Sequence, residues 1–173
     1  YIAPLHRRWT QRAREAGRPS FVHLDGTLRP LITELSKNGF QVIEAVTPKP
    51  VGDLEVKELR QYVKDETILW GGLPGGFFTE EMSDEAFDAY VIDVIHTMKQ
   101  QGNFVLGVAD QVVPGSSFRR IQRVSQLIEK YGKLDNEGIY LFGASAGGAA
   151  GRNPRSSAGS APGLYVQYAH SRV

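Results

Sequence analysis

The chain has 173 residues, of which 41% are hydrophobic, and a formal net charge of +1. This length and composition fit one globular domain, and the near-zero charge gives no signature of nucleic-acid binding. The sequence contains no Cys, which excludes disulfides, thiolate metal ligands and cysteine nucleophiles. Its apolar runs are strand-sized and interrupted by Gly, Pro or charge, so we expect no membrane span, no signal peptide and a cytoplasmic location.

The first predicted helix covers residues 5–16. Apolar side chains, including Leu5 and Trp9, keep helical spacing until Gly17 stops the helix. We interpret the basic residues of this segment as a solvated helix face: Arg7, Arg8, Arg12 and Arg14. The chain starts at Tyr1 without an initiator Met and enters helical sequence almost at once, from which we expect that an amino-terminal part is missing.

The first predicted strand, residues 20–24, leads into the most informative pair of side chains. Side chains alternate across a strand, so His23 and Asp25 point the same way just where the strand ends. A glycine follows and permits a sharp turn, after which Asp25 or Thr27 can cap an amphipathic helix over residues 28–35. The pattern predicts a βα unit with polar groups at its carboxyl edge.

The second predicted strand, residues 40–45, is rich in Val and Ile and again has a carboxylate, Glu44, near its end. A loop with two prolines follows, and it cannot continue a sheet or a helix. Asp53 is then placed to cap a helix with apolar positions between 56 and 63.

The third predicted strand, residues 67–70, runs into a glycine-rich segment that starts with Gly71 and Gly72. We predict a tight turn there, in which the missing Cβ atoms let the backbone approach a bound ligand or form a pocket wall. The segment lacks both the GxGxxG spacing and a P-loop Lys, so it gives little support to a nucleotide site.

The clearest predicted helix begins after Ser83, whose hydroxyl can cap it, and ends at Gly102. His96 lies at the margin of its apolar stripe, and we interpret it as a surface or partly packed histidine. Residues 103–108 form the fourth predicted strand, which places Asp110 at its carboxyl edge, and a last helix begins at about residue 117.

Four strands that alternate with helices are typical of parallel βαβ units. A doubly wound sheet and an eight-stranded barrel both agree with this pattern. In either architecture, functional groups gather at the carboxyl ends of the strands. The sequence places five features there: His23, Asp25, Glu44, the Gly71-Gly72 turn and Asp110.

The composition changes after Gly132, where Gly, Ala, Ser and Arg replace the amphipathic pattern. We therefore assign residues 1–132 to the α/β domain and residues 133–173 to a low-complexity tail. Such a composition buries little apolar surface, so we expect disorder or loose packing over residues 144–163. A translation artefact is an alternative origin of this tail.

One short motif in the tail suggests a hydrolase. Gly143, Ser145 and Gly147 match the G-x-S-x-G nucleophile elbow and resemble that of carboxylesterases. His170 follows Ser145, but no Asp or Glu lies between Ser145 and the carboxyl terminus to complete the triad in that fold's chain order. We interpret the motif as a coincidence of low-complexity sequence.

The polar groups at the strand ends allow three interpretations. His23, Asp25 and a carboxylate from another strand are hard nitrogen and oxygen ligands that Zn²⁺ or another divalent ion accepts. The same side chains could transfer protons without a metal. They could also form a structural polar rim in which Asp25 only caps its helix.

Several segments together resemble the carboxyl-terminal half of the uroporphyrinogen decarboxylase-like family, over residues 1–132. The resemblance lies in His23-Leu24-Asp25-Gly26, in Gly39-Phe40-Gln41-Val42-Ile43, in Leu69-Trp70-Gly71-Gly72-Leu73-Pro74, and in Gly107-Val108-Ala109-Asp110 before Pro114. It implies a (βα)8 TIM barrel in which the four strands are the fifth to the eighth. Within such a barrel, the shared position at strand ends makes His23, Asp25, Glu44 and Asp110 the candidate catalytic residues, and the missing Cβ atoms make Gly71 and Gly72 candidate cofactor-binding residues.

Two activities dominate this family: decarboxylation of porphyrinogen acetate groups without a cofactor, and zinc-dependent methyl transfer that involves corrinoid proteins. The family's methyltransferases carry His-x-Cys at the positions of His23 and Asp25 and a further Cys near Asp110, so two thiolates are carboxylates here. The decarboxylases place a His near Asp110, and their substrate-binding Arg and Asp lie in the half that this chain lacks.

The resemblance therefore implies metal-assisted methyl transfer to or from a small molecule, with zinc or another divalent metal on His23, Asp25 and Asp110. A corrinoid protein would be the partner. Decarboxylation without a metal is the alternative. A third possibility is an inactive half barrel that only binds a ligand or a partner, the missing amino-terminal half first of all, because unpaired strand edges favour association.

Overall fold

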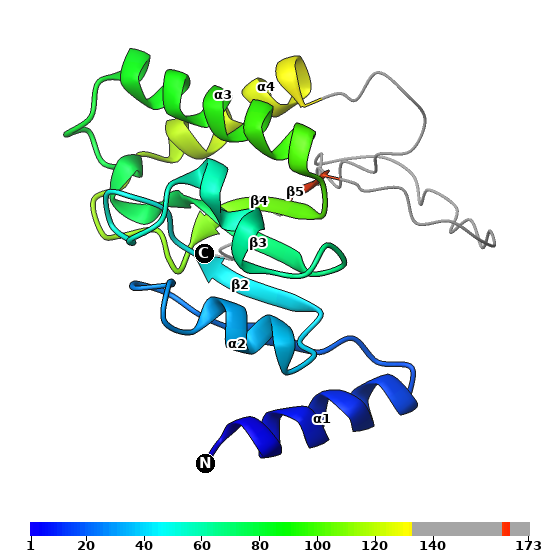
Figure 1. The fold of residues 1–173 in the computed structure, drawn as a ribbon. Helices are drawn as coiled ribbons and strands as arrows, with labels where there is room; N and C mark the ends of the chain where they lie inside the picture. Colours follow the sequence, from blue (N-terminus) through cyan, green and yellow to red (C-terminus); the bar gives the residue numbers. More distant parts are fainter. Residues whose placement is uncertain (133–163, 167–173) are drawn as a thin grey trace.

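The computed structural model describes residues 1–132 and 164–166 of the chain. Helices and strands alternate along it (Figure 1). The strands are β1 (Phe21–His23), β2 (Val42–Val46), β3 (Ile68–Pro74), β4 (Phe104–Ala109) and β5 (Leu164–Val166). The α-helices are α1 (Ala3–Glu15), α2 (Ile32–Lys37), α3 (Asp84–Gln101) and α4 (Phe118–Tyr131), and the 3-10 helices are η1 (Val56–Tyr62) and η2 (Gly75–Phe78).

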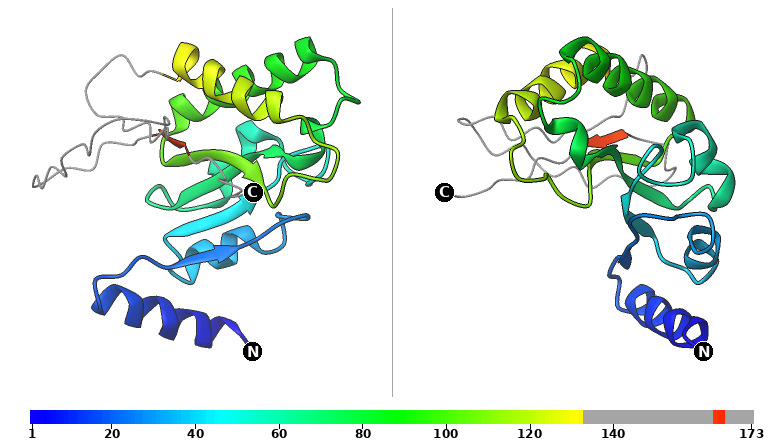
Figure 2. Two further views of the ribbon diagram at one scale, coloured as in Figure 1. Left: turned by 180° about the vertical axis from the view of Figure 1, so that it is seen from behind. Right: turned by 90° about the vertical axis from the view of Figure 1, so that its left-hand side faces the viewer.

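The described strands form one parallel sheet in the order β1-β2-β3-β4-β5. A doubly wound sheet reverses its strand order at a switch point, and no such reversal occurs among these strands. Right-handed crossovers between strands in sequential order all lead to the same side of a sheet. The helices accordingly lie in an arc on one side of the strands (Figure 2). The predicted parallel α/β architecture is confirmed.

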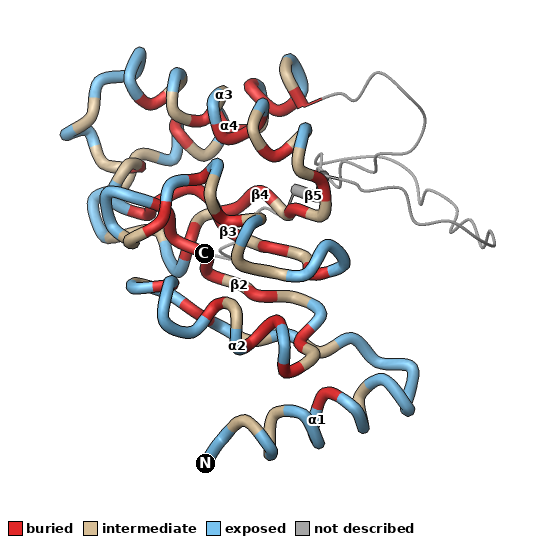
Figure 3. Tube along the Cα trace, viewed as in Figure 1, coloured by how far each residue is buried: buried red, intermediate tan, exposed pale blue. Residues whose placement is uncertain are grey.

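The core lies between the sheet and the long helices, where the buried segments of Figure 3 face each other. Strand residues such as Leu69 and Phe104 pack with Val94 and Ile95 of α3, and all four are fully buried. Burial of each such side chain contributes about 1.5–3 kcal/mol. Ser83 caps α3 by accepting a hydrogen bond from the Ala86 amide at 3.2 Å, as predicted.

The predicted capping of the helix after β1 is wrong. Residues 28–31 form a turn, and α2 begins only at Ile32. Neither Asp25 nor Thr27 caps this segment. The carboxylate of Asp53 accepts hydrogen bonds from the amides of Leu28 at 2.8 Å and Arg29 at 3.2 Å. A loop distant in sequence thus provides the acceptor for these two amides. The predicted capping of η1 by Asp53 is also wrong, because Glu55 and Glu58 form its capping box.

The predicted turn at Gly71 and Gly72 is also wrong, because β3 continues through both residues to Pro74. Gly71 has φ of +142°, and a Cβ at this position would lie 2.5 Å from the backbone oxygen of Val46. A Cβ on Gly72 would lie 2.8 Å from the ring of Phe104. The absence of side chains here is explained by close packing of β3 against its neighbours.

The two ends of the chain differ from expectation. Trp9 of α1 is 52% exposed, and the buried residue of this helix is Thr10, whose hydroxyl donates to the Asn38 carbonyl at 2.7 Å. Strand β5 lies within the segment predicted as a tail and pairs with β4. The predicted loose segment 144–163, the Ser145 motif and His170 lie outside the described residues.

Candidate active site at the carboxyl edge of the sheet

His23 and Glu44 form the first part of the site because they are register partners on β1 and β2. Side chains at the same level of neighbouring parallel strands lie on the same face of the sheet. The Nδ1 atom of His23 lies 2.6 Å from Oε2 of Glu44. The His23 side chain is 50% exposed and that of Glu44 only 19%, so the ring is anchored at its inner nitrogen and open on its outer side.

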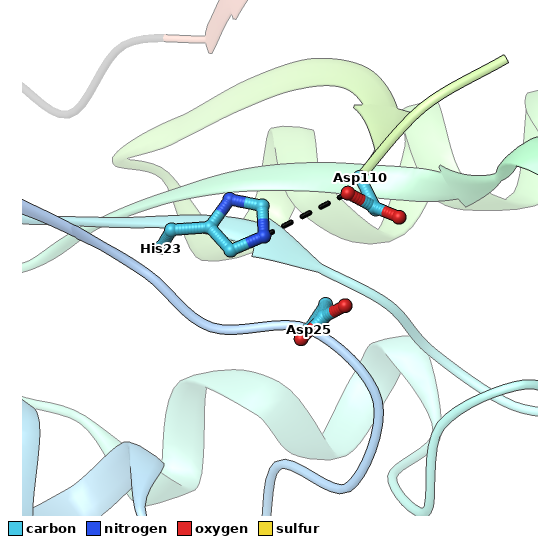
Figure 4. A group of neighbouring side chains, drawn as sticks. All are labelled: His23, Asp25 and Asp110. Atoms are coloured by element: carbon cyan, nitrogen blue, oxygen red, sulfur yellow. Dashed lines mark ion pairs between the residues drawn. The ribbon is translucent and has the colours of Figure 1, made fainter.

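Asp25 and Asp110 complete the site (Figure 4). One potential ligand atom from each of His23, Asp25 and Asp110 lies within 4.8 Å of the other two. The Nε2 atom of His23 lies 3.7 Å from Oδ1 of Asp110. Asp25 lies just beyond the end of β1, whereas Asp110 follows the last residue of β4. Sequence positions 85 residues apart thus meet at one edge of the sheet, as predicted.

A β-bulge in β2 lies beside this site. The register to β3 shifts by one residue between Ile43 and Val46. Ala45, inside the bulge, has φ of +65°, and Asp110 has φ of +64°. Non-glycine residues in this left-handed region are uncommon, and they gather at functional sites where surrounding structure holds them. Two of the three such residues in the described part of the chain therefore lie at this edge.

The charges around His23 are predominantly negative. Its pKa is raised above the usual value, first by the hydrogen bond to Glu44 and then, against a smaller opposing effect of burial, by the charges of Glu44, Asp25 and Asp110. An imidazolium stabilised in this way can donate a proton. It can equally lose its proton to solvent when a divalent cation binds, since metal binding requires neutral histidine.

The other predicted features lie elsewhere. Gly71 and Gly72 are internal to β3, and their backbone packs on β2 and β4 rather than opening a pocket. His96 is on the surface of α3 with its ring edge-on to Tyr131, as predicted for a non-catalytic histidine. A surface groove of about 500 Å³ lies between α3 and α4, but its arginines pair with Asp84 and Asp88.

Sequence reasoning missed the direct pairing of Glu44 with His23 and the bulge that follows Glu44. The sequence shows that both residues stand near the ends of their apolar runs, but it does not show the register between the two strands, which is not a local property. No protein-family model and no curated protein matches this chain. We therefore infer the chemistry of the site from its geometry.

Proposed function

We propose that this chain is the carboxyl-terminal half of a (βα)8 enzyme of the uroporphyrinogen decarboxylase-like type, with β1 to β4 as its fifth to eighth strands. Its function is metal-assisted methyl transfer between a corrinoid protein and a small molecule. The unreversed order of parallel strands, with helices on one side, supports the barrel. In a closed barrel, the barrel's own first strand, from the amino-terminal half, would pair with β4. Strand β5, which pairs with β4 here, would then have to move away.

The observation that carries the proposal is the convergence of His23, Asp25 and Asp110, whose ligand atoms lie within 4.8 Å of one another. One imidazole and two carboxylates fit zinc or another divalent ion. These three side chains would hold the metal, while Glu44 holds the ring of His23 from behind. A metal bound here supplies Lewis acidity to a methyl acceptor or donor.

The negative charge of the site supports a metal over an anionic substrate. Three carboxylates surround His23, and the ion pairs of His23 within the described residues are with Glu44 and Asp110. A substrate that carries several carboxylates of its own would be repelled, whereas a divalent cation would be attracted. The half-exposed ring of His23 leaves the site accessible to a small molecule.

A second candidate function is decarboxylation of porphyrinogen acetate groups without a cofactor. The raised pKa of His23 favours it, because an imidazolium can protonate the carbon that loses CO2. A third is a catalytically inactive half barrel that binds a partner. In the described strands β1 has a neighbour on one side only, and its Phe21 is 66% exposed, as expected of a strand that pairs with a missing half.

The proposal is tested by titrating zinc into the metal-free chain at about pH 7.5 and measuring the heat of binding by calorimetry. Protons that zinc displaces from its ligands pass to the buffer under these conditions. We expect one zinc per chain and a loss of affinity of at least about tenfold in each of His23→Gln and Asp110→Asn. Asp93→Asn, on the exposed side of α3, is the matched control and should bind as the unmodified chain does.

A chain that binds no zinc, or variants that bind it unchanged, would exclude the proposed zinc site. Release of CO2 from a porphyrinogen by the zinc-free chain would support the second candidate. The third candidate would be supported if the chain neither binds zinc nor releases CO2, but forms a stable complex with a separately expressed amino-terminal half barrel.

A further inference from the structure

We propose that Glu44 is a positioning residue that fixes the ring tautomer of His23 and so presents the Nε2 lone pair to the space between Asp25 and Asp110. This inference builds on the proposed metal site. It differs from the role predicted from the strand-end position of Glu44, in which Glu44 belongs to the catalytic set itself.

The contact between the two side chains defines which nitrogen carries the proton. Oε2 of Glu44 lies 2.6 Å from Nδ1 of His23. An ionised carboxylate can only accept hydrogen bonds, so the neutral ring that satisfies this contact has its proton on Nδ1. Nε2 is then the free lone pair, and it lies on the side of Asp110, at 3.7 Å from Oδ1 (Figure 4).

The position of Glu44 in the sheet makes this contact rigid. It is the register partner of His23, so the two Cα atoms are held by the backbone ladder of β1 and β2. Its side chain is 19% exposed, which limits competition from water. The bulge at Ala45 comes directly after Glu44 in β2, and the next residue, Val46, has its backbone packed against Gly71 of β3. The backbone of Glu44 is therefore held at the level of His23.

Glu44 lies outside the set of potential metal ligands. The atoms that lie within 4.8 Å of one another come from His23, Asp25 and Asp110. A carboxylate that holds the far nitrogen of a ligating histidine orients the ring and raises its basicity, and loss of such a partner costs about 10–100-fold in metal affinity.

The test measures the tautomer of His23 without metal and the zinc affinity separately. Long-range proton–nitrogen NMR of the ¹⁵N-labelled chain at about pH 9, where imidazole is neutral, reports which ring nitrogen is protonated. We expect Nδ1–H in the unmodified chain and in Glu44→Gln, whose amide oxygen still accepts. Glu44→Ala should shift the ring toward Nε2–H and lower zinc affinity about 10–100-fold, with a smaller loss in Glu44→Gln.

Glu34→Ala is the control, because Glu34 is an exposed residue of α2 that pairs with Lys37. It should change neither readout. If Glu44→Ala keeps the Nδ1–H form, the positioning role is wrong even if zinc binds to the chain. If the tautomer shifts but no zinc binds to the unmodified chain, the positioning role stands and the proposed metal site is wrong.

Discussion

The two edges of the parallel sheet use charged side chains in opposite ways. At the amino edge, the guanidinium of Arg60 donates to the carbonyls of Thr67, Gly102 and Asn103 at 2.7–3.0 Å, just before β3 and β4 begin. At the carboxyl edge, His23 and Asp110 are half exposed, and their side chains meet one another rather than the backbone.

This difference separates a structural arginine from the polar groups of the candidate site. Arg60 binds three backbone carbonyls at the starts of two strands, and burial lowers its pKa below that of a free guanidinium. At the carboxyl edge, ligand atoms of His23, Asp25 and Asp110 lie within 4.8 Å of one another, so two carboxylates are held close together. A cluster of like charges on a backbone held in unusual conformations is the kind of site that binds a ligand.

The largest expected effect comes from a change to the backbone that supports the carboxyl edge. In Gly71→Ala the new Cβ would lie 2.5 Å from the backbone oxygen of Val46, at a φ of +142°. We expect the free energy of unfolding, measured with urea, to fall by about 3–5 kcal/mol. Gly76→Ala is the control, since nothing lies within 4 Å of its Cβ. A mild effect of Gly71→Ala would mean that β2 can move away.

A smaller loss of stability is expected from a substitution at the amino edge. Arg60→Met keeps an unbranched, largely apolar stem but removes the donors to the carbonyls before β3 and β4. The free energy of unfolding should fall by about 2–4 kcal/mol, because these part-buried carbonyls lose their hydrogen bonds to the guanidinium. Arg12→Met, on the exposed side of α1, should change it by less than about 0.5 kcal/mol. Equal effects of the two variants would remove the contrast between the edges.

The smallest effect concerns the pH dependence at the carboxyl edge. The folded state raises the pKa of His23, so the pairing with Glu44 stabilises the fold below about pH 6.5, the unfolded value. This contribution is lost as the pH rises through the folded-state pKa. Because His23 is half exposed, we expect less than about 1 kcal/mol.

The measurement compares the free energy of unfolding of the unmodified chain with that of Glu44→Gln at about pH 5.5 and pH 8.5. The unmodified chain should be the more stable of the two at the lower pH, and the difference should shrink at the higher pH. A difference that grows with pH would contradict the charge arrangement described for His23.

Local patterns were sufficient for much of the architecture. The apolar runs predicted four of the described strands, and the position of His23, Asp25, Glu44 and Asp110 at strand ends predicted which side chains meet. The hydroxyl of Ser83 and the glycine at 102 marked the limits of α3 correctly. These signals are local, because side-chain alternation, helical spacing and capping depend on residues a few positions apart.

The predictions that failed depend on contacts between distant segments. The donors at residues 28 and 29 take Asp53 as their acceptor, and the glycines of β3 fit against β2 and β4 instead of turning. Strand β5 has three residues and lies beside β4, which no local pattern indicated.

By itself the sequence determined the parallel α/β class and the set of polar residues at one edge, because both follow from periodicity along the chain. Only the tertiary structure decided the role of each residue. The register of β1 on β2 places Glu44 on Nδ1 of His23, and the end of β4 brings Asp110 toward Nε2. Register and strand order are set by packing of the whole sheet, which no single segment encodes.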